Sequence, residues 1–201
     1  MRLVLLGHAA TAAVRTAAFP ADEPLDARGR TDATTLAGRL RRVDDVRRGP
    51  SARCRETAEL IGVGPAVVEP DLAGPDHGRW TGRSLAEVVT AEPDGVRAWT
   101  ADPDARPHGG ESLTDLTVRV GRWMDGLVRG AGDVLLAVVD PPVLRAAVVH
   151  ATGAGPAALW RVDVAPLTLL TITAGPGGWH LRSLRPALST PDDELVQLAG
   201  S

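Results

Sequence analysis

The chain opens on the stretch Arg2-Leu3-Val4-Leu5-Leu6-Gly7-His8, and this stretch decides the expected fold. Residues 2–6 form a mainly apolar run that ends at Gly7, which is typical of a buried parallel strand leading into a loop. A second run of the same kind covers residues 133–139 and is followed by Asp140. Because ligands bind at the carboxyl ends of parallel strands, a site is expected where these two runs end, at Gly7-His8 and Val139-Asp140.

The segments around these two runs alternate between helical and extended patterns. Helices are predicted over residues 32–43, 52–62, 84–99 (one or two helices, broken near Pro93), 112–129, 143–152 and, in short form, 156–161. Further strands are predicted over residues 66–68, 167–173 and 179–184. The alternation indicates an α/β fold, a three-layer sandwich with a mostly parallel central sheet. The sequence contains no linker-like stretch and no internal repeat, so one domain over residues 1–201 is expected.

The composition argues against several classes of protein. All 22 basic residues are Arg, and the chain lacks Lys, Asn and Tyr, a bias that a G/C-rich genome explains without reference to function. A hydrophobic content of 44% with 23% charged residues is typical of a globular protein, and a net charge of −3 argues against a basic nucleic-acid binder. The single Cys54 excludes a disulfide framework, and no segment reaches 18 apolar residues. We therefore expect a cytoplasmic protein without nucleic-acid or membrane partners.

Short blocks of sequence in a fixed order carry a resemblance to a known family. The blocks are Leu5-Leu6-Gly7-His8-Ala9-Ala10-Thr11, Pro50-Ser51-Ala52-Arg53-Cys54-Arg55-Glu56-Thr57-Ala58, His77-Gly78-Arg79-Trp80-Thr81-Gly82, Gly109-Gly110-Glu111-Ser112 and Val134 to Arg145. They resemble, in order, the Arg-His-Gly, Ser-Pro-x-x-Arg-Ala-x-x-Thr-Ala, Gly-x-Trp-x-Gly, Gly-Gly-Glu-Ser and strand–Ser-His-Gly-Gly–helix blocks of the histidine phosphatase superfamily. The resemblance runs nearly end to end, and it implies the phosphoglycerate-mutase-like fold.

The resemblance also implies a set of roles for individual residues. In this family a His attacks phosphorus, two Arg and a second His bind the phosphoryl oxygens, and a carboxyl group protonates the leaving oxygen. Carried over, His8 is the expected nucleophile, Arg53 one of the phosphate-binding arginines and Glu111 the acid. No metal or other cofactor is expected from the family's chemistry.

Other positions depart from the family pattern. Gly7 stands where the family has the Arg before its nucleophile, Ala9 replaces the following Gly, and Gly74 aligns with the Glu of mutase-type members. Asp140, followed by Pro141-Pro142, stands where the family has its second His. The pocket thus loses one positive charge and gains one negative charge, each worth about 1–4 kcal/mol near 4 Å. At about 1.4 kcal/mol per factor of ten, ordinary phosphatase or mutase activity is disfavoured.

The residues that remain suit proton transfer. Asp140 could orient His8 and raise its basicity, Glu111 could act as the complementary acid, and Arg53 could bind a carboxylate or phosphate of the substrate. The prediction is an isomerase, lyase, cyclase or hydrolase acting on a small anionic metabolite. Two alternatives stay open, namely a catalytically dead pseudophosphatase or binding module, and a phosphomonoesterase that acts through His8.

Further residues are assigned by their position in the blocks. Gly7 and His108 are expected to contact the substrate, and Trp80 is expected to line the mouth of the pocket. A metal site made of His8, Asp140, Glu111 and His108 is disfavoured because the spacing carries no metal signature. His77 is expected in loop packing or as a wall facing the substrate. The sequence is compatible with a homodimer, although no surface stripe demands one.

Overall fold

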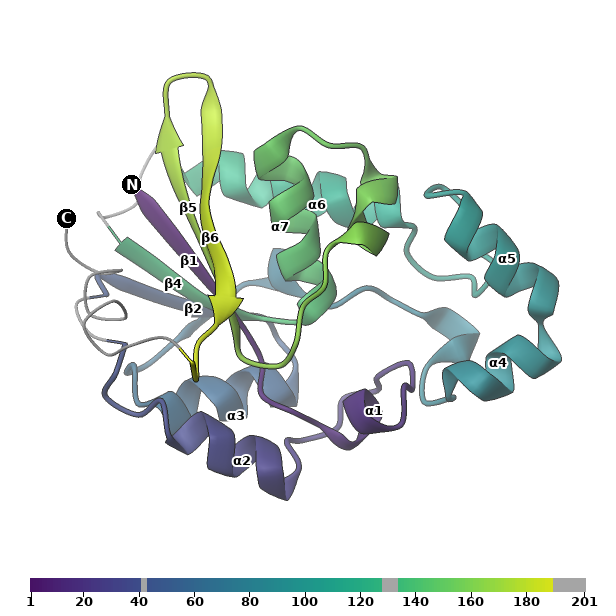
Figure 1. Ribbon diagram of the computed structural model, residues 1–201, viewed down its shortest axis with the longest axis horizontal. Helices are drawn as coiled ribbons and strands as arrows, with labels where there is room; N and C mark the ends of the chain where they lie inside the picture. The colour runs from purple at the N-terminus through teal and green to yellow at the C-terminus, as the bar shows by residue number, and fades with distance from the viewer. Residues whose placement is uncertain (41–42, 128–133, 190–201) are drawn as a thin grey trace.

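The computed structural model describes residues 1–40, 43–127 and 134–189, and its centre is a six-stranded sheet (Figure 1). The strands are β1 (Arg2–Gly7), β2 (Asp45–Arg48), β3 (Val67–Val68), β4 (Val134–Val139), β5 (Thr168–Gly175) and β6 (Gly178–Pro186), in the order β3-β2-β4-β1-β5-β6. Strands β3, β2, β4 and β1 pair in parallel, whereas β5 and β6 are antiparallel. The sheet is therefore mixed and mostly parallel, as predicted.

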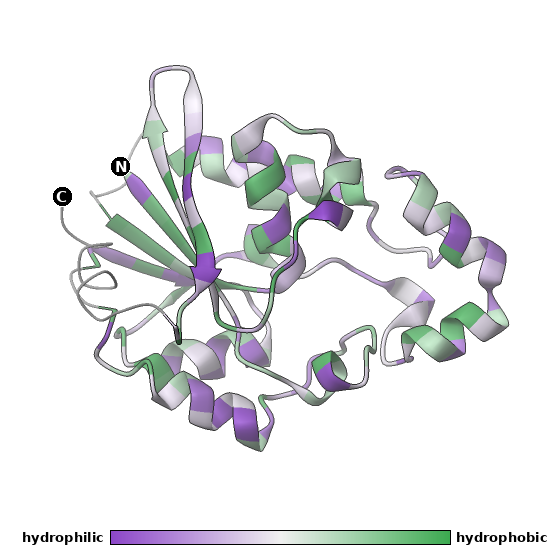
Figure 2. Ribbon diagram, in the orientation of Figure 1, coloured by the Kyte–Doolittle hydropathy of each residue, from purple (hydrophilic) through white to green (hydrophobic). Residues whose placement is uncertain are grey.

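Helices cover both faces of this sheet, and the alternation of side chains along β1 shows why. Leu3 and Leu5 belong to a core cluster with the helices on one face, while Val4 and Leu6 belong to the cluster on the other. Successive residues of a strand point to opposite faces, so a run that is apolar at every position needs a helix layer on each side. Figure 2 shows mainly hydrophobic residues along the central strand β4 and mixed hydrophobic and hydrophilic residues along the helices.

The two layers differ in their helices. One layer contains α6 (Leu113–Leu127), α7 (Pro141–Thr152) and the 3-10 helix η3 (Pro156–Arg161), and the other contains α2 (Ala27–Thr34) and α3 (Ala52–Ile61). The short α1 (Ala12–Arg15) follows the loop after β1, and the 3-10 helices η1 (Pro70–Leu72) and η2 (Gly78–Trp80) follow β3. Helices α4 (Leu85–Ala91) and α5 (Pro93–Ala101) lie to one side of the sheet and break at Pro93, as predicted.

The helix predicted over residues 32–43 is wrong in its position over residues 32–40, while residues 41 and 42 lie outside the described part of the chain. Helix α2 begins earlier, because the Asp26 side chain accepts a hydrogen bond from the Gly29 amide (2.7 Å) and caps the helix at Ala27. It ends at Thr34, and the following turn brings Gly38 to a φ of 72°. Leu36 and Leu40 still reach the core, but from the turn rather than from a helix face.

Strand β2 is not predicted by the sequence pattern. Its residues Asp45–Arg48 are mostly charged, and they form a strand by pairing in parallel with β4 and β3. Arg47 is paired with Asp45 (2.9 Å) and with Glu69 (2.5 Å) beside β3. Within the described part of the chain, no helix is long and apolar enough to cross a membrane.

Candidate active site

The ends of β1 and β4 meet, as the apolar runs predict, and they place His8 beside Asp140. Gly7 pairs with Val139, and the His8 amide donates to the Val139 carbonyl oxygen (2.9 Å). The His8 imidazole is 3% exposed, and its Nδ1 lies 2.7 Å from the Ala9 carbonyl oxygen. Because a carbonyl oxygen only accepts hydrogen bonds, Nδ1 carries a proton and donates it to this bond. Nε2 is then the atom that faces the pocket, 3.4 Å from Asp140 Oδ1.

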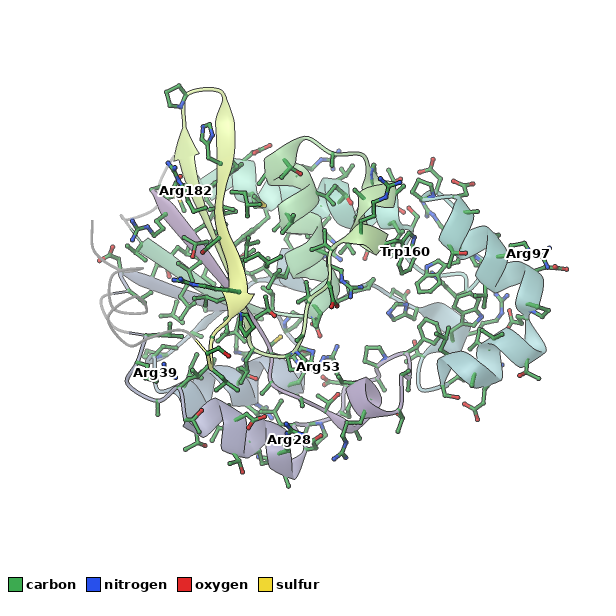
Figure 3. All side chains as sticks on the ribbon, viewed as in Figure 1. Arg28, Arg39, Arg53, Arg97, Trp160 and Arg182 are labelled. Carbon is green, nitrogen blue, oxygen red and sulfur yellow. The ribbon has the colours of Figure 1, made fainter. Side chains whose placement is uncertain are left out.

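Asp140 also forms an ion pair with Arg53, which lies near the start of α3 (Figure 3 labels Arg53). Arg53 Nε donates to Asp140 Oδ1, and one terminal nitrogen, Nη1, donates to the Ala21 carbonyl oxygen (2.6 Å) and lies 3.9 Å from Glu23 Oε1. The Ser51 hydroxyl, at the N-cap of α3, donates to Asp140 Oδ2 (3.4 Å). The sequence predicts that Arg53 binds an anionic group of the substrate. In the structure, Arg53 is instead paired with a carboxylate of the protein itself.

The charges of this cluster hold Asp140 ionised. Burial acts to raise the pKa of Asp140, but the contact with His8 and the charge of Arg53 outweigh it, so the pKa lies below its usual value. Burial acts to lower the pKa of Arg53, and Asp140 more than offsets this effect. The Cys54 thiol, buried next to them, has a pKa raised well above its usual value by burial and by the charge of Asp140, so the thiol stays protonated and unreactive.

Gly74 makes room for the Asp140 carboxylate. A Cβ atom at Gly74 would lie 3.1 Å from both Cγ and Oδ2 of Asp140, which is tighter than ordinary carbon contacts. A Cβ atom at Gly7 would instead meet its nearest neighbour, the Thr168 carbonyl oxygen, at an ordinary 3.7 Å. A side chain at Gly74 would therefore press on the Asp140 carboxylate, whereas a side chain at Gly7 would make ordinary contacts with its immediate neighbours.

Two cavities adjoin at this site, and both are lined by Ala18, Pro20, Pro75, His77 and Pro142. The first, here named the His8 cavity, has a volume of about 150 Å³ and is also lined by His8, Arg53 and Asp140. The second, here named the Trp cavity, has a volume of about 180 Å³ and is also lined by Phe19, Trp99, Glu111, Leu113, Arg145, Leu159 and Trp160. The shared wall makes the two cavities neighbouring compartments of one site.

The structure separates other predicted site residues from His8. Glu111 lines the Trp cavity, and both of its carboxylate oxygens accept hydrogen bonds from Arg119 (2.9 and 2.7 Å). Trp80 is fully buried and meets His108 edge to face with 5.1 Å between ring centroids, and neither residue lines the His8 or the Trp cavity. Gly7 is a buried backbone position at the end of β1. Trp80 and His108 therefore support the wall of the site from behind.

His77 and Arg145 are the site residues to which the sequence gives little weight. His77 lines both cavities, and burial together with the neighbouring His108 lowers its pKa to about 4, so its imidazole is neutral at pH 7. Arg145 lies on α7 in the last of the sequence blocks, but only the folded structure shows that it faces a cavity. Within the described residues, no group of three or more His, Cys, Asp or Glu side chains is arranged to hold a metal ion.

Comparisons with known proteins agree with the fold. The sequence model of the histidine phosphatase superfamily (branch 1) matches residues 3–186. The crystal structure of the α-ribazole phosphatase from Shigella flexneri superposes with a TM-score of 0.82 at 24% identity, covering 95% of this chain and 98% of that chain, and this likeness shows the fold alone.

Two curated relatives match parts of the chain. A bifunctional protein of Mycobacterium tuberculosis is 34% identical over 106 residues, which are 51% of this chain and 29% of that protein. Phosphoserine phosphatase 1 of Hydrogenobacter thermophilus is 31% identical over 110 residues, which are 52% of each chain. The match thus spans at most about half the length of either relative.

Proposed function

The chain belongs to the histidine phosphatase superfamily, branch 1, and from this premise we propose that it is an enzyme performing acid/base chemistry through His8 and Asp140 rather than phosphoryl transfer. The observation that carries the proposal is the ion pair between Arg53 and Asp140, directly beside His8 Nε2. It bears both on what the pocket binds and on how His8 exchanges protons.

The charge of the His8 cavity disfavours a phosphoryl dianion. Arg53 is neutralised by Asp140, and Glu23 adds a second carboxylate 3.9 Å from Arg53 Nη1. Catalysis of phosphoryl transfer needs preorganised positive charge around the equatorial oxygens. An incoming phosphate would have to displace the ionised Asp140 carboxylate from Arg53 or bind next to it, and both cost free energy through lost pairing or like-charge repulsion.

The same geometry favours proton transfer. The Ala9 carbonyl fixes the proton on Nδ1, so the lone pair of Nε2 is available to take a proton from a substrate in the His8 cavity. The imidazolium formed in that step lies 3.4 Å from Asp140 Oδ1, whose negative charge stabilises it. In an isomerisation or cyclisation the proton then returns from Nε2 to another atom of the substrate. In an elimination it goes to the leaving group, and in a hydrolysis Nε2 takes the proton from an attacking water molecule and gives it to the leaving group. Arg53 acts in this scheme as a positioning residue for Asp140.

A phosphomonoesterase acting through His8 is the second candidate. Its support is the same lone pair of Nε2, which faces the His8 cavity and could attack phosphorus, together with the partial match to a protein named phosphoserine phosphatase. A binding protein without turnover is a third outcome that the experiment below distinguishes.

The test compares the wild type with His8→Ala and Asp140→Asn, with His180→Ala on strand β6 as a histidine control away from the site. An aryl phosphate reports phosphatase activity, and deuterium incorporation from D₂O into small carbonyl and hydroxy acids, followed by NMR, reports proton transfer. We expect exchange that both site variants abolish and His180→Ala retains. Aryl phosphate turnover lost in His8→Ala would contradict the proposal in favour of the second candidate. Binding of a carbonyl or hydroxy acid without deuterium exchange and without aryl phosphate turnover would indicate the third outcome, a binding protein.

A further inference from the structure

The Trp cavity contains a cation without a partner. Arg145 lines this cavity, and its Nε is buried without a hydrogen-bond partner. The remaining guanidinium nitrogens make no hydrogen bond or ion pair with any described residue, and Asp163 acts on Arg145 only through its charge at longer range. Arg145 is half-buried, and this burial lowers its pKa. An arginine held in this way is costly unless a ligand completes its hydrogen bonds.

The acidic residue of the same cavity does not compensate this charge. Both oxygens of Glu111 are engaged by Arg119, and Arg119 is further anchored to the Asp71 and Ala73 carbonyl oxygens (2.7 and 3.1 Å). The Glu111–Arg119 pair is therefore neutral and fixed. The cavity keeps one net positive charge, on Arg145, and so favours an anionic group.

The other walls are aromatic and apolar. Trp99 of α5 and Trp160 of η3 meet edge to face with their ring centroids 4.6 Å apart, and Phe19 packs on Trp99 at 5.5 Å. Trp160, labelled in Figure 3, is 40% exposed although it is the kind of side chain that folding normally buries. A cavity of about 180 Å³ has room for one six-membered ring with a substituent.

From these observations we propose that the Trp cavity binds a ring-bearing carboxylate, with the ring against Trp99 and Trp160 and the carboxylate on Arg145. The ring stacks in the offset or edge-on geometry that aromatic pairs prefer, and the guanidinium provides paired donors for the two carboxylate oxygens. The proposal deepens the proposed function, on which it rests, because it names the substrate class whose reacting part would lie in the adjoining His8 cavity.

Binding of benzoate tests the proposal without any need for turnover. Titration is followed calorimetrically and by tryptophan fluorescence, with benzamide as the neutral analogue and cyclohexanecarboxylate as the non-aromatic one. We expect benzoate to bind with a dissociation constant of about 1 mM or lower, as its size allows. Benzamide should bind at least about tenfold more weakly, since it cannot form the charge-assisted pair.

Variants locate the bound molecule. Arg145→Met should weaken benzoate binding about 10- to 100-fold, the range for loss of a charge-assisted hydrogen bond. Trp160→Ala should weaken it through loss of ring contact. Arg97→Met, which removes an exposed arginine from α5, is the matched control and should bind like the wild type. Arg145→Met should also unfold at a temperature no lower than that of the wild type. If Arg145 had a purely structural role, its replacement would lower the unfolding temperature.

The two proposals fail separately. His8→Ala should keep benzoate affinity, because His8 does not line the Trp cavity. Binding that persists while proton exchange is absent in the wild type would overturn the proposed function and leave the ring-carboxylate site standing. Equal binding of benzoate and benzamide, equal binding to the wild type and Arg145→Met, or no binding of benzoate at 10 mM would overturn the site itself.

Discussion

Replacement of Asp140 by Asn isolates the charge at the centre of the site. Asp140 is 2% exposed and shares its carboxylate between Arg53, His8 and Ser51. The Asp140→Asn change keeps the volume and one acceptor oxygen but removes the negative charge. Among the described residues, Arg53 then remains buried with only Glu23, 3.9 Å away, as a counter-charge. We therefore expect the variant to fold with lower stability than the wild type.

The size of the loss follows from the burial of the pair. Removing one partner of a buried ion pair costs about 3–5 kcal/mol because the other charge stays buried and unpaired. The amide oxygen of Asn can still accept a hydrogen bond from Arg53 Nε, which recovers about 1 kcal/mol. The expected loss is therefore about 2–4 kcal/mol, or about 4–16 °C in Tm for a chain of this length.

The loss should depend on pH in a direction that the pKa of Asp140 sets. This pKa is lower in the folded protein than in the unfolded chain, so the stabilisation by the carboxylate is complete above the unfolded value of about 4. It fades as the pH falls through the folded value and Asp140 takes up a proton. The wild type and Asp140→Asn should therefore differ by a constant amount between pH 6 and pH 8, and should converge below pH 4.

Urea unfolding at a series of pH values measures this difference, and Asp94→Asn is the matched control. Asp94 pairs with Arg97 on the surface of α5, where both side chains are largely exposed, so its loss should cost less than about 1 kcal/mol. A double variant, Arg53→Met with Asp140→Leu, should regain stability relative to Asp140→Asn because it removes both charges. The reasoning is refuted if Asp140→Asn is no less stable than Asp94→Asn at pH 7, or if its deficit persists unchanged at pH 3.

The other predictions concern the residues around Asp140. Gly74→Ala should lower the free energy of unfolding by about 1–3 kcal/mol, because the new Cβ would press on Asp140 at 3.1 Å. Thermal unfolding should show a smaller loss when Gly74→Ala is made in Asp140→Ala than in the wild type. Equal losses would contradict the contact. Gly7→Arg combined with Asp140→His should raise aryl phosphatase activity at least about tenfold by reversing the two charge changes near the phosphoryl position; a rate no higher than that of the wild type would argue against the alignment of the two strand ends. The neutral His77, with a pKa of about 4, binds protons less readily than in the unfolded chain. The wild type should therefore lose stability as the pH falls from about 6.5 to about 4, and His77→Phe should lose less. Parallel pH profiles of the free energy of unfolding would exclude this role.

Apolar runs and helix signals predict most of the fold because they depend on local composition. Strands β1 and β4 are apolar at almost every position, and that pattern directly requires two helix layers. Strand β2 cannot be predicted in the same way because it is mostly charged. Its Arg47 pairs with Glu69, which lies more than twenty residues further along the chain. The helix predicted over residues 32–43 fails for a related reason, since a turn can bury Leu36 and Leu40 as well as a helix can.

The site is predictable in its position but not in its internal pairing. The parallel pairing of β1 with β4 brings His8 next to Asp140, and this follows from the two strand ends alone. The sequence assigns Arg53 and Glu111 to the substrate or the reaction, yet in the structure Arg53 binds Asp140 and Glu111 binds Arg119. Which acid a given arginine pairs with depends on tertiary geometry, because the chain offers 22 arginines and 25 acidic residues to choose from.

The contrast between Arg53 and Arg145 bears on whether the site is maintained for activity or only for stability. A pocket selected only for folding would keep the Arg53–Asp140 pair, since both charges are satisfied and the loss of either one is costly. The same selection would not keep Arg145, whose Nε is buried without a partner and whose removal costs the fold no hydrogen bond to any described residue. A half-buried cation whose Nε has no partner lowers stability, and we expect it to be retained where it serves binding. The stability of Arg145→Met relative to the wild type therefore distinguishes a functional site from one that has lost its function. A functional site predicts that Arg145→Met is at least as stable as the wild type and loses benzoate binding.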